Sequence, residues 1–564
     1  MSAQKLITDH LDLWTGAVTH KSSRGRGSNG KIELTGIKKL RELILELAVR
    51  GKLVDQNPSD EPASVLLERI AEEKARLVKE GKIKKPRKLA PLSGIEKPYQ
   101  LPSGWRWAQL EELGHDWGQQ QPKQLFSYID VSAIDNVKGK IGKPEIIEPE
   151  NSPSRARKKV KPGTLIYSTI RPYLQNIAVV DEEIEPEPIA STAFAIISPL
   201  RGIPARFLLH YLRSPVFVRY VESVQTGIAY PAINDKQFFS GICPVPPLTE
   251  QHRIVEKVDE LMALCDRLEQ QVGDQLEAHE VLVDTLLDAL TRSVDAAEVA
   301  ENWARIAEHF DTLFTTEASI DKLKQTILQL AVMGRLVEQD PNDEPASVLL
   351  ERIAEEKARL IKEGKIKKPK PLPEIADNEE PFPIPNEWRW VRFGEITFNR
   401  DSERIPLSVN ERSRRKGEYD YYGASGIIDK IDDFLFEKPL LLIGEDGANL
   451  INRSTPIAFI ARGKYWVNNH AHVIDGISED FLKYLSLYIN AISLEPYVTG
   501  TAQPKMNQAK MNSIVVGLPP IQEQQRLIEK YDEFMALCDQ LKTRLSEAGE
   551  TRTHLAEAVV EQAV

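Results

Sequence analysis

The sequence predicts two mixed α/β (α+β) domains in tandem, separated by long antiparallel coiled-coil helices and related as a pseudo-two-fold internal repeat. Three observations predict this fold class. The segment Asp60–Pro86 recurs at Asp343–Pro369 with a single difference, Val78 against Ile361. Two inserts between the repeated segments alternate β-branched and aromatic runs with turns. An apolar stripe with a heptad-like period follows each insert.

The repeat extends well beyond this segment. Upstream, residues 39–54 match 322–337, and downstream two Trp-x-Trp motifs (Trp105 and Trp388) precede two Pro-Pro motifs (Pro246 and Pro519). The match runs through loops and prolines, which argues against an accident of helical composition. Between the Trp-x-Trp and Pro-Pro motifs the halves share little sequence. The predicted boundaries are an N-terminal helical region 1–99, a first insert 100–245, a central helical region with a coiled-coil helix 246–383, a second insert 384–517 and a C-terminal coiled-coil helix 518–564.

The composition is that of a globular protein. The 564 residues are 41% hydrophobic and 28% charged, no apolar run approaches the length of a membrane span, and the N-terminus lacks a signal-peptide core. The three cysteines fit a reducing cytoplasm, where we expect the protein. A net charge of −11 does not exclude a nucleic-acid partner, because the distribution of charge decides such binding.

Helices are expected at 4–14 and 35–49, with Gly51 ending the second. Asp60 is expected to cap the repeated helix, and Gly81 to end it. A basic, proline-bearing linker follows each copy of this helix. It is either a solvated connector or a contact to DNA phosphate or to a partner subunit.

The first insert combines strands with two basic clusters. Strands are expected at 127–134, 164–168, 176–180 and 190–197, followed by helices at 205–214 and 215–224. Arginine and asparagine side chains can contact base edges, and lysine neutralises phosphate. A solvated basic loop is the alternative for the Arg-Lys cluster taken alone. The candidate DNA-binding residues here are Arg155, Arg157, Lys158, Lys159, Arg171, Tyr173 and Asn176.

The second insert carries a comparable set of arginine, tyrosine and asparagine residues. His470 and His472 could instead be metal ligands, but a third and a fourth ligand are not obvious. Glu445 and Asp446 are either paired catalytic carboxylates or, as we favour, a tight acidic turn flanked by glycines; no catalytic residue and no metal ligand is assigned. The candidate DNA-binding residues here are Arg400, Arg404, Arg414, Arg415, Tyr421, Tyr422, Asn449, Asn469 and His470.

Apolar stripes predict two long helices, the first from about Glu250 to Arg292. Its stripe runs from Ile254 to Val272 and is expected to continue imperfectly through Gln275, His279, Leu282 and Leu286. The second stripe runs from Leu527 to Leu545. The two stripes are expected to pack against each other in antiparallel order, and a helix of some 40 residues, about 60 Å long, would act as a ruler between two domains. The seam residues expected to bind partner subunits are Leu261, Cys265, Leu268, Phe534, Cys538 and Leu541.

With these motifs in view, the chain resembles the specificity (S) subunit of type I restriction–modification systems, most closely the type IB subfamily. The resemblance rests on the paired Trp-x-Trp entries, the Thr-Gly-x-Ala exits at Thr226–Ala229 and Thr499–Ala502, the Pro-Pro-x-x-Glu-Gln helix starts, and the insert patterns YIDVSAID…IYSTIRPYLQN and YYGASGIID…LLIGEDG. It covers nearly the whole chain.

The resemblance implies a non-catalytic DNA-binding subunit with two target-recognition domains, one in each insert. Each domain would read one half of a bipartite site in double-stranded DNA, with the helices fixing the gap. Two modification (methyltransferase) subunits would dock on the helices and methylate adenine with S-adenosylmethionine. Restriction subunits, which use ATP and magnesium for translocation and cleavage, would join that complex. This chain would bind no cofactor itself.

Two other classes of protein fit the sequence less well. A self-contained DNA methyltransferase needs an Asn/Asp-Pro-Pro-aromatic pocket, whereas the double prolines here follow Val245 and Leu518 and begin helices. No convincing nuclease carboxylate cluster is evident. A scaffold that binds only proteins would have similar inserts, and the divergent basic-aromatic inserts argue against it.

Overall fold

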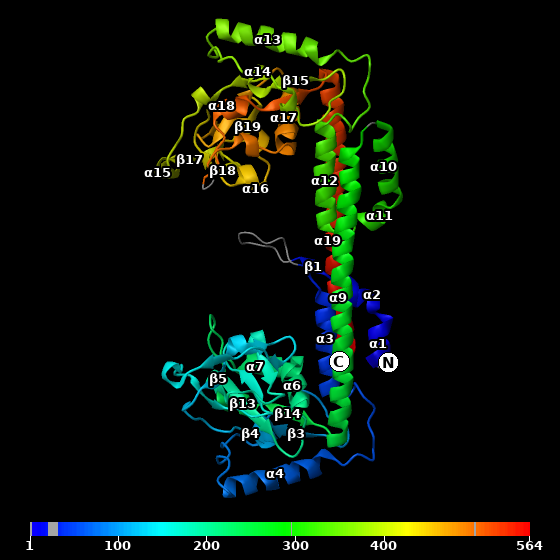
Figure 1. Ribbon diagram of the computed structural model, residues 1–564, viewed down its shortest axis with the longest axis vertical. Helices are drawn as coiled ribbons and strands as arrows, with labels where there is room; N and C mark the ends of the chain where they lie inside the picture. Colours follow the sequence, from blue (N-terminus) through cyan, green and yellow to red (C-terminus); the bar gives the residue numbers. More distant parts are fainter. Residues whose placement is uncertain (1–2, 21–31, 295, 501–502, 564) are drawn as a thin grey trace. The chain divides into compact units, whose positions relative to one another are not determined.

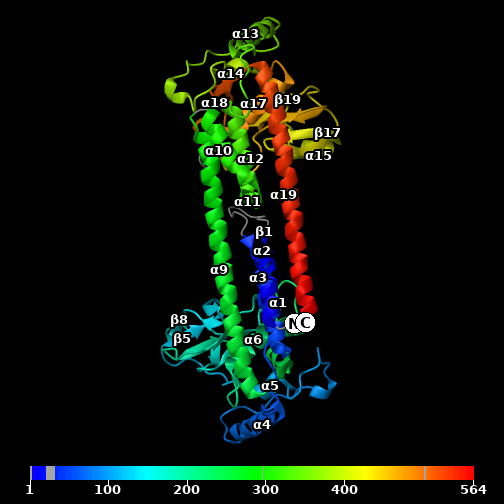
Figure 2. The same cartoon turned by 90° about the vertical axis from the view of Figure 1, so that its right-hand side faces the viewer.

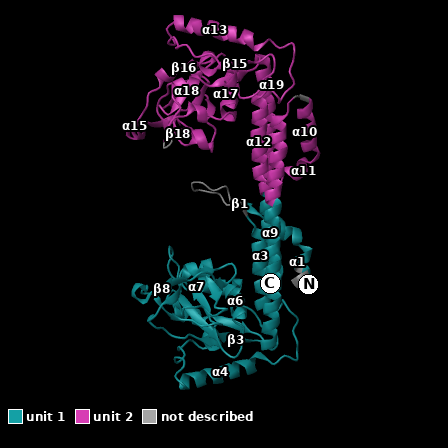
Figure 3. Cartoon of the chain, in the orientation of Figure 1, with its two compact units in different colours: residues 1–275, 547–564 teal, residues 276–546 magenta. Residues whose placement is uncertain are grey.

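A computed structural model describes residues 3–20, 32–294, 296–500 and 503–563. The chain forms two compact units, residues 1–275 with 547–564 and residues 276–546 (Figure 3). Helix α9 (Leu248–Arg292) begins in the first unit and ends in the second, whereas α19 (Ile521–Ala563) begins in the second and ends in the first. Each unit adds to these helices a mixed α/β head, residues 106–245 in the first and 389–518 in the second.

In the first unit, α3 (Thr35–Val49) packs between the start of α9 and the end of α19 (Figures 1 and 2). The apolar residues of α3 recur every three to four positions and are buried together with Ile254, Val258 and Cys265 of α9 and Ala556 of α19. At the rim of this core, Arg41 donates hydrogen bonds to Asp266 and Glu269 of α9 at 2.7 and 2.8 Å. The predicted helix 35–49 therefore joins both long helices within this unit.

In the second unit, α12 (Glu317–Val332) takes the same role. Its Ile320, Leu323 and Ile327 share a core with Val283 of α9 and Cys538 of α19. Ion pairs flank this core, from Lys322 of α12 to Asp284 of α9 and from Lys542 of α19 to Asp321 of α12, the latter at 2.8 Å. Helices α10 (Ala296–Glu308) and α11 (Phe310–Leu313) also contribute to it.

The apolar stripe of α9 therefore packs on α3, and the stripe of α19 packs on α12. The stripes alone did not predict these partner helices. The expected continuation of the first stripe through Leu282 is wrong, because the side chain of Leu282 is exposed and Val283, Leu287 and Leu290 are buried instead. Val272 and Val283 are separated by three turns of a helix with about 3.67 residues per turn. A strict heptad would place the next apolar residue at Leu282, so the buried face has moved by one residue.

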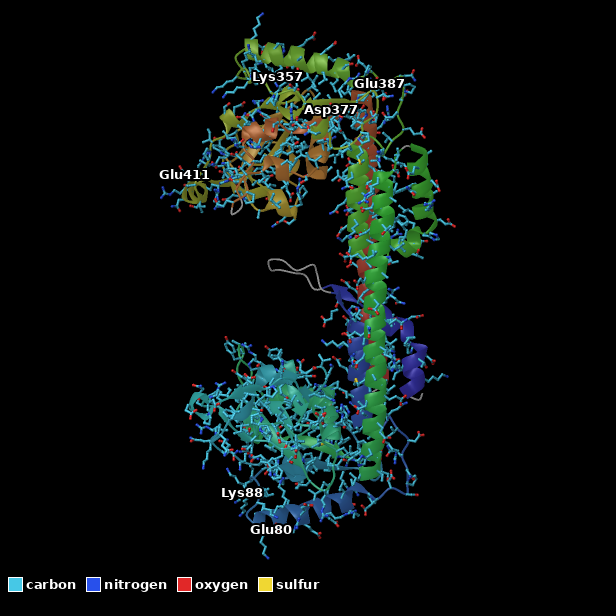
Figure 4. The ribbon with its side chains drawn as sticks, viewed as in Figure 1. Glu80, Lys88, Lys357, Asp377, Glu387 and Glu411 are labelled. Atoms are coloured by element: carbon cyan, nitrogen blue, oxygen red, sulfur yellow. The ribbon has the colours of Figure 1, made fainter. Side chains whose placement is uncertain are left out.

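The two nearly identical segments form α4 (Ala63–Lys79) and α13 (Ala346–Lys362). Only a narrow stripe of each is buried, such as Leu66 and Ile70 in α4. Lys74 donates to the carbonyls of Glu111 and Gly114, and Lys357, labelled in Figure 4, donates to three carbonyls of the second head. The predicted N-cap at Asp60 is wrong. Pro62 precedes α4, and the Asp60 carboxylate accepts a hydrogen bond from Arg253 at 2.7 Å instead.

One junction attaches each head to its long helix, and it explains the Trp and Pro-Pro motifs. The strand that contains Trp107 pairs with the strand just before Pro246, as β3 (Arg106–Gln109) with β14 (Ile242–Val245), and β15 (Arg389–Arg392) pairs with β23 (Val515–Leu518) in the same antiparallel register. The buried indole of Trp105 donates to Glu250 in the first turn of α9 at 3.0 Å, and that of Trp388 donates to Glu523 in α19 at 2.8 Å.

Beneath their divergent sequences, the two heads share a four-stranded arrangement. The order β4-β13-β10-β11 in the first corresponds to β16-β22-β19-β20 in the second, with every neighbouring pair antiparallel. Helix α6 packs on this sheet in the first head and α17 in the second. The bounds are β4 (Gly114–His115), β10 (Leu165–Ser168), β11 (Ile177–Val179), β13 (Phe194–Pro199), β16 (Phe398–Asn399), β19 (Leu440–Gly444), β20 (Ala458–Ala461), β22 (Ala471–Asp475), α6 (Ala205–Arg213) and α17 (Glu479–Ala491).

A second sheet distinguishes the heads. The first head has the order β8-β5-β12-β9, and the second has β18-β17-β21. These bounds are β5 (Phe126–Ile129), β8 (Glu145–Ile147), β9 (Ala156–Lys159), β12 (Pro188–Ser191), β17 (Lys416–Gly423), β18 (Gly426–Ile431) and β21 (Tyr465–Val467). The remaining helices and strands are α1 (Ala3–Asp9), α2 (Leu11–Gly16), β1 (Thr19–His20), β2 (Ile32–Glu33), α5 (Leu110–Leu113), β6 (Ile134–Asp135), β7 (Lys140–Ile141), α7 (Pro215–Val224), α8 (Asp235–Ser240), α14 (Phe393–Ile396), α15 (Val409–Arg414), α16 (Asn449–Asn452) and α18 (Gln508–Asn512).

Candidate nucleic-acid interface

Two loops in each head are tied together by the same backbone hydrogen bonds, and we call each pair the tip of its head. The first tip comprises residues 169–175 and 226–232. The second comprises 445–453 and 499–505, of which 501 and 502, including Ala502 of the Thr-Gly-x-Ala exit, lie outside the described residues.

The hydrogen bonds of the two tips correspond one to one. Thr226 and Ala232 exchange backbone bonds at 2.9 Å, as Thr499 and Lys505 do at 2.9 and 2.8 Å. The N–H of Arg171 donates to the carbonyl of Pro231 at 2.8 Å, and that of Gly447 donates to the carbonyl of Pro504 at 3.0 Å. Ile233 N–H donates to the Thr169 carbonyl at 2.9 Å, and Met506 N–H donates to the Glu445 carbonyl at 2.8 Å. Backbone bonds tolerate any side chain, so this frame can carry different residues.

The two glycines of the Thr-Gly-x-Ala exits are required by this frame. Gly227 and Gly500 have φ of 90° and 84°, which favours glycine, and a Cβ at either would approach a backbone oxygen to 2.8 Å. The exit motifs thus mark the turn that builds each tip.

The first tip exposes aromatic and aliphatic side chains around one arginine. Tyr173, Ile228 and Tyr230 are exposed, and the guanidinium of Arg171 lies 5.0 Å from the centre of the Tyr230 ring. Arg171 and Gln175 both adopt left-handed backbone conformations, with φ of 47° and 49°. Such strain in residues other than glycine gathers at binding and catalytic sites. In such an arrangement the guanidinium of the arginine can hydrogen-bond to base edges, and the exposed rings can stack on bases or contact methyl groups.

The second tip is charged. His470, which directly precedes β22 and lies outside the two loops, has its Nδ1 2.8 Å from a carboxylate oxygen of Asp446, and the ammonium of Lys505 lies 3.2 Å from Glu445. The side chain of Asn449 makes its hydrogen bonds within the head: its amide nitrogen donates to Thr455, and its oxygen accepts from Ser454 and Thr455. Imidazole and ammonium groups suit hydrogen bonds to base edges and phosphates, and a carboxylate can accept from a base amino group.

A set of buried charges lies directly beneath the second tip. His472 on β22 is 1% exposed; its Nδ1 is 2.7 Å from Asp401 and its Nε2 is 2.9 Å from the carbonyl oxygen of Met506. Arg404 donates to Glu445 at 3.0 Å. Burial opposes the charge of His472, but the hydrogen bonds to Asp401 and Met506 and the charges of Asp401 and Glu445 together outweigh it and raise the pKa of His472 above its ordinary value. Burial likewise opposes the charge of Asp401, yet the hydrogen bond to His472 lowers the pKa of Asp401.

The predicted residues of the first head fall into two groups. Arg155, Arg171 and Tyr173 are exposed, and Arg157 and Lys159 are half-buried. Lys158 and Asn176 are buried, and the Lys158 ammonium lies 2.9 Å from Asp235. The assignment of Lys158 and Asn176 to DNA is corrected, because their side chains do not reach the surface. Contact by the other five remains a prediction.

In the second head, several of the predicted DNA-binding side chains already contact other residues of the same head. Arg400 pairs with Asp475 at 3.0 Å, and Arg415 pairs with Asp432 at 2.9 Å. Tyr421 is fully buried, and its hydroxyl accepts from the N–H of Leu407, so its assignment to DNA is corrected. Tyr422 is half-buried and stacks on Phe459 with ring centres 5.8 Å apart. Arg414 and Asn469 are exposed, and with His470 they remain predictions.

Sequence reasoning missed Tyr230 and Lys505 as candidate contacts. Each belongs to the second loop of its tip. Tyr230 lies three residues after Gly227, and Lys505 lies six residues after Thr499. The signal that could have found them is the Thr-Gly pair of the exit motif, which indicates a tight turn with an exposed loop.

The predicted partner-binding seam residues lie in the cores of their own units. Leu261 and Cys265 are buried against α3 and Leu268 packs at the edge of the same core, while Cys538, with Phe534 and Leu541 beside it, packs in the core around α12. Burial raises the pKa of the Cys265 thiol to about 11. Docking of partner subunits at this helical seam region remains a prediction.

The two histidines considered as metal ligands face different carboxylates, His470 facing Asp446 and His472 facing Asp401. Within the described ranges, no group of three or more His, Cys, Asp or Glu side chains is placed to hold a metal ion. None of the helices in the described part of the chain is both long and apolar enough to span a membrane.

Two heads with one backbone frame and unlike exposed tips define a protein with two different recognition surfaces. The family model for the type I restriction modification DNA specificity domain matches residues 135–278 and 385–548. The EcoEI and EcoAI type I restriction enzyme specificity subunits of Escherichia coli are 41% and 42% identical to the chain, each alignment covering the whole of both proteins. A solved chain from work on a type I R-M system shares the fold, with a TM-score of 0.50 and 23% identity over 83% of this chain and 99% of its own.

The chain therefore belongs to the family of type I restriction–modification specificity subunits, and it carries two recognition domains. The predicted family and the predicted fold class are confirmed. Assignment to the type IB subfamily remains a prediction.

Proposed function

We propose that each head reads one half of a bipartite DNA site through its tip, and that α9 and α19 set the gap between the halves. The observation that supports this most directly is the pair of tips. Their backbone hydrogen bonds correspond one to one, but most of their exposed side chains differ, which is the pattern expected of two readers of two sequences.

The helical parts would dock two modification subunits, which methylate adenine in flipped-out nucleotides using S-adenosylmethionine. Restriction subunits using ATP and magnesium would complete the assembly in the cytoplasm, and this chain would bind no cofactor. Membership of the family supports these partners.

The second candidate, a self-contained methyltransferase or nuclease, is not favoured. The carboxylates that might serve catalysis, Glu445 and Asp446, are engaged by Arg404, Lys505 and His470. The discriminating experiment incubates the purified chain with labelled S-adenosylmethionine and genomic DNA, with and without the modification subunits. Methyl transfer is expected only when those subunits are added. Transfer by the chain alone would refute its role as a binding subunit.

The spacing role has its own test. Insertion of one heptad into both α9 and α19, at matched points, lengthens each helix by about 10 Å, or about three base pairs. The preferred gap should lengthen accordingly, or binding should be lost because the half-sites rotate about the DNA axis. An unchanged gap would contradict the role of the helices as a ruler.

A further inference from the structure

Among the described residues, the buried His472 beneath the second tip has no ionisable counterpart at the corresponding position of the first head. The strand registers place His472 opposite Ile443, and the corresponding position of the first head, Ala195, opposite Tyr167. The residues that begin the tips are Glu445 and Thr169, and the residues that close them are Lys505 and Ala232. At these corresponding positions the second head carries the ionisable residues His472, Glu445 and Lys505, and the first head carries Ala195, Thr169 and Ala232.

His472 makes two hydrogen bonds that require a proton on each ring nitrogen. The carbonyl oxygen of Met506 can only accept, so Nε2 carries a hydrogen. Asp401 already accepts from the N–H of Val473 at 2.8 Å and faces Nδ1 at 2.7 Å, which as a carboxylate requires a hydrogen on Nδ1 as well. The bound ring is therefore an imidazolium.

These bonds link the imidazolium to both loops of the tip. Met506 directly follows Lys505, the last residue of the second loop, and its N–H bonds to Glu445, the first residue of the first loop. The charged groups facing His472 are the carboxylates of Asp401 and, at 3.8 Å, Glu445, whose charge is shared with Arg404 and Lys505. Loss of one proton would leave lone pairs facing each other either between Nδ1 and Asp401 or between Nε2 and the carbonyl oxygen of Met506.

We propose that His472, as an imidazolium, is a positioning residue for the second tip, so that recognition of one half-site weakens with rising pH and recognition of the other does not. The expected effect on half-site recognition rests on the proposed DNA-reading function. The positioning itself concerns this chain alone and can be tested without DNA.

The first arm of the test measures amide hydrogen exchange of the full chain between about pH 6 and about pH 9, corrected for intrinsic rates. The amides of Thr499, Lys505 and Met506 are compared with their counterparts at Thr226, Ala232 and Ile233. Protection of the second tip should fall with rising pH, by up to about tenfold for each unit by which the fold raises the pKa. The first tip should not follow.

Two variants separate positioning from a purely structural role. His472→Gln should abolish the pH dependence of the second tip while leaving the first unchanged. Asp401→Asn removes the charge that holds the proton and should move the midpoint to lower pH. Equal pH profiles in both tips, or a wild-type profile in His472→Gln, would overturn the proposal.

The second arm measures binding of the full chain to a duplex obtained by selection from randomised DNA, and to the same duplex with either half-site scrambled. Preference for one half-site should decline over the pH range in which the second tip loses protection. If exchange follows pH while both preferences stay constant, the positioning role stands and the reading of DNA by this tip is overturned.

Discussion

The two heads differ most where their backbones agree most. Both attach to a long helix by a tryptophan–glutamate bond, and both build their tips with the same set of backbone bonds. The first tip nevertheless presents tyrosine, isoleucine and arginine, whereas the second presents lysine and aspartate, with His470 beside it. The comparison teaches that the frame is specified by a few positions, chiefly Trp, Gly and Pro, which leaves the exposed positions free to differ.

The largest expected effect tests whether the junction is common to both heads. Trp105→Ala and Trp388→Ala each remove a fully buried indole, so each should lower the free energy of unfolding of its unit by about 3–5 kcal/mol. The matched Trp→Phe variants keep a ring and lose the hydrogen bond to glutamate, and should cost about 1–3 kcal/mol. Denaturant unfolding, followed in each unit by hydrogen exchange, measures both. A large loss in one head without the other would break the equivalence.

Arg171→Ala tests the first tip as a reader. If its guanidinium contacts a base, binding to the selected duplex should weaken by about 1–3 kcal/mol, and preference at that base should relax. Arg201→Ala is the control, since this arginine also has a left-handed backbone but pairs with Glu73 of α4 at 2.6 Å, away from the tip. Unchanged affinity and preference in Arg171→Ala would remove this residue from the interface.

The stability of the two units should respond to pH in opposite directions. The raised pKa of His472 gives the second unit stability that is fully present below the unfolded value near 6.5 and is lost as pH rises through the folded value. In the first unit, burial lowers the pKa of His210, so that unit loses stability as pH falls below about 6.5. Hydrogen exchange of each core against pH measures the two slopes. Slopes of the same sign would contradict this assignment.

The smallest effect concerns α4 and α13. Val78→Ile and Ile361→Val exchange the single difference between the two segments at half-buried positions, so each should change the free energy of unfolding by less than about 0.5 kcal/mol. Thermal unfolding of the two variants checks this. A larger change at either position would show that the segments are adapted to their own heads.

Local pattern was enough to predict much of the scaffold. The bounds of α3 match the predicted helix 35–49, and the periodic run after Pro246 forms α9. These elements are specified by neighbours three to seven residues apart, which the sequence displays directly.

The site was harder to predict, because its contacts are long-range. Arg400 and Lys158 look like solvent-exposed cations in the sequence, but their carboxylate partners, Asp475 and Asp235, lie about 75 residues away and on other elements. The sequence around Tyr421 predicts an exposed aromatic side chain, but packing within the second sheet buries it. The shared frame of the tips was hidden for the same reason, since backbone bonds leave no mark on the sequence apart from the Thr-Gly pairs.

The DNA motif that the assembled complex selects from randomised duplexes, measured for the wild type, Tyr230→Ala and Lys505→Ala, tests most directly whether each tip reads one half-site. We predict a motif of two elements at a constant gap, with Tyr230→Ala blurring one element and Lys505→Ala blurring the other. A single contiguous motif, or variants that blur both elements or neither, would contradict the assignment of one tip to each half-site.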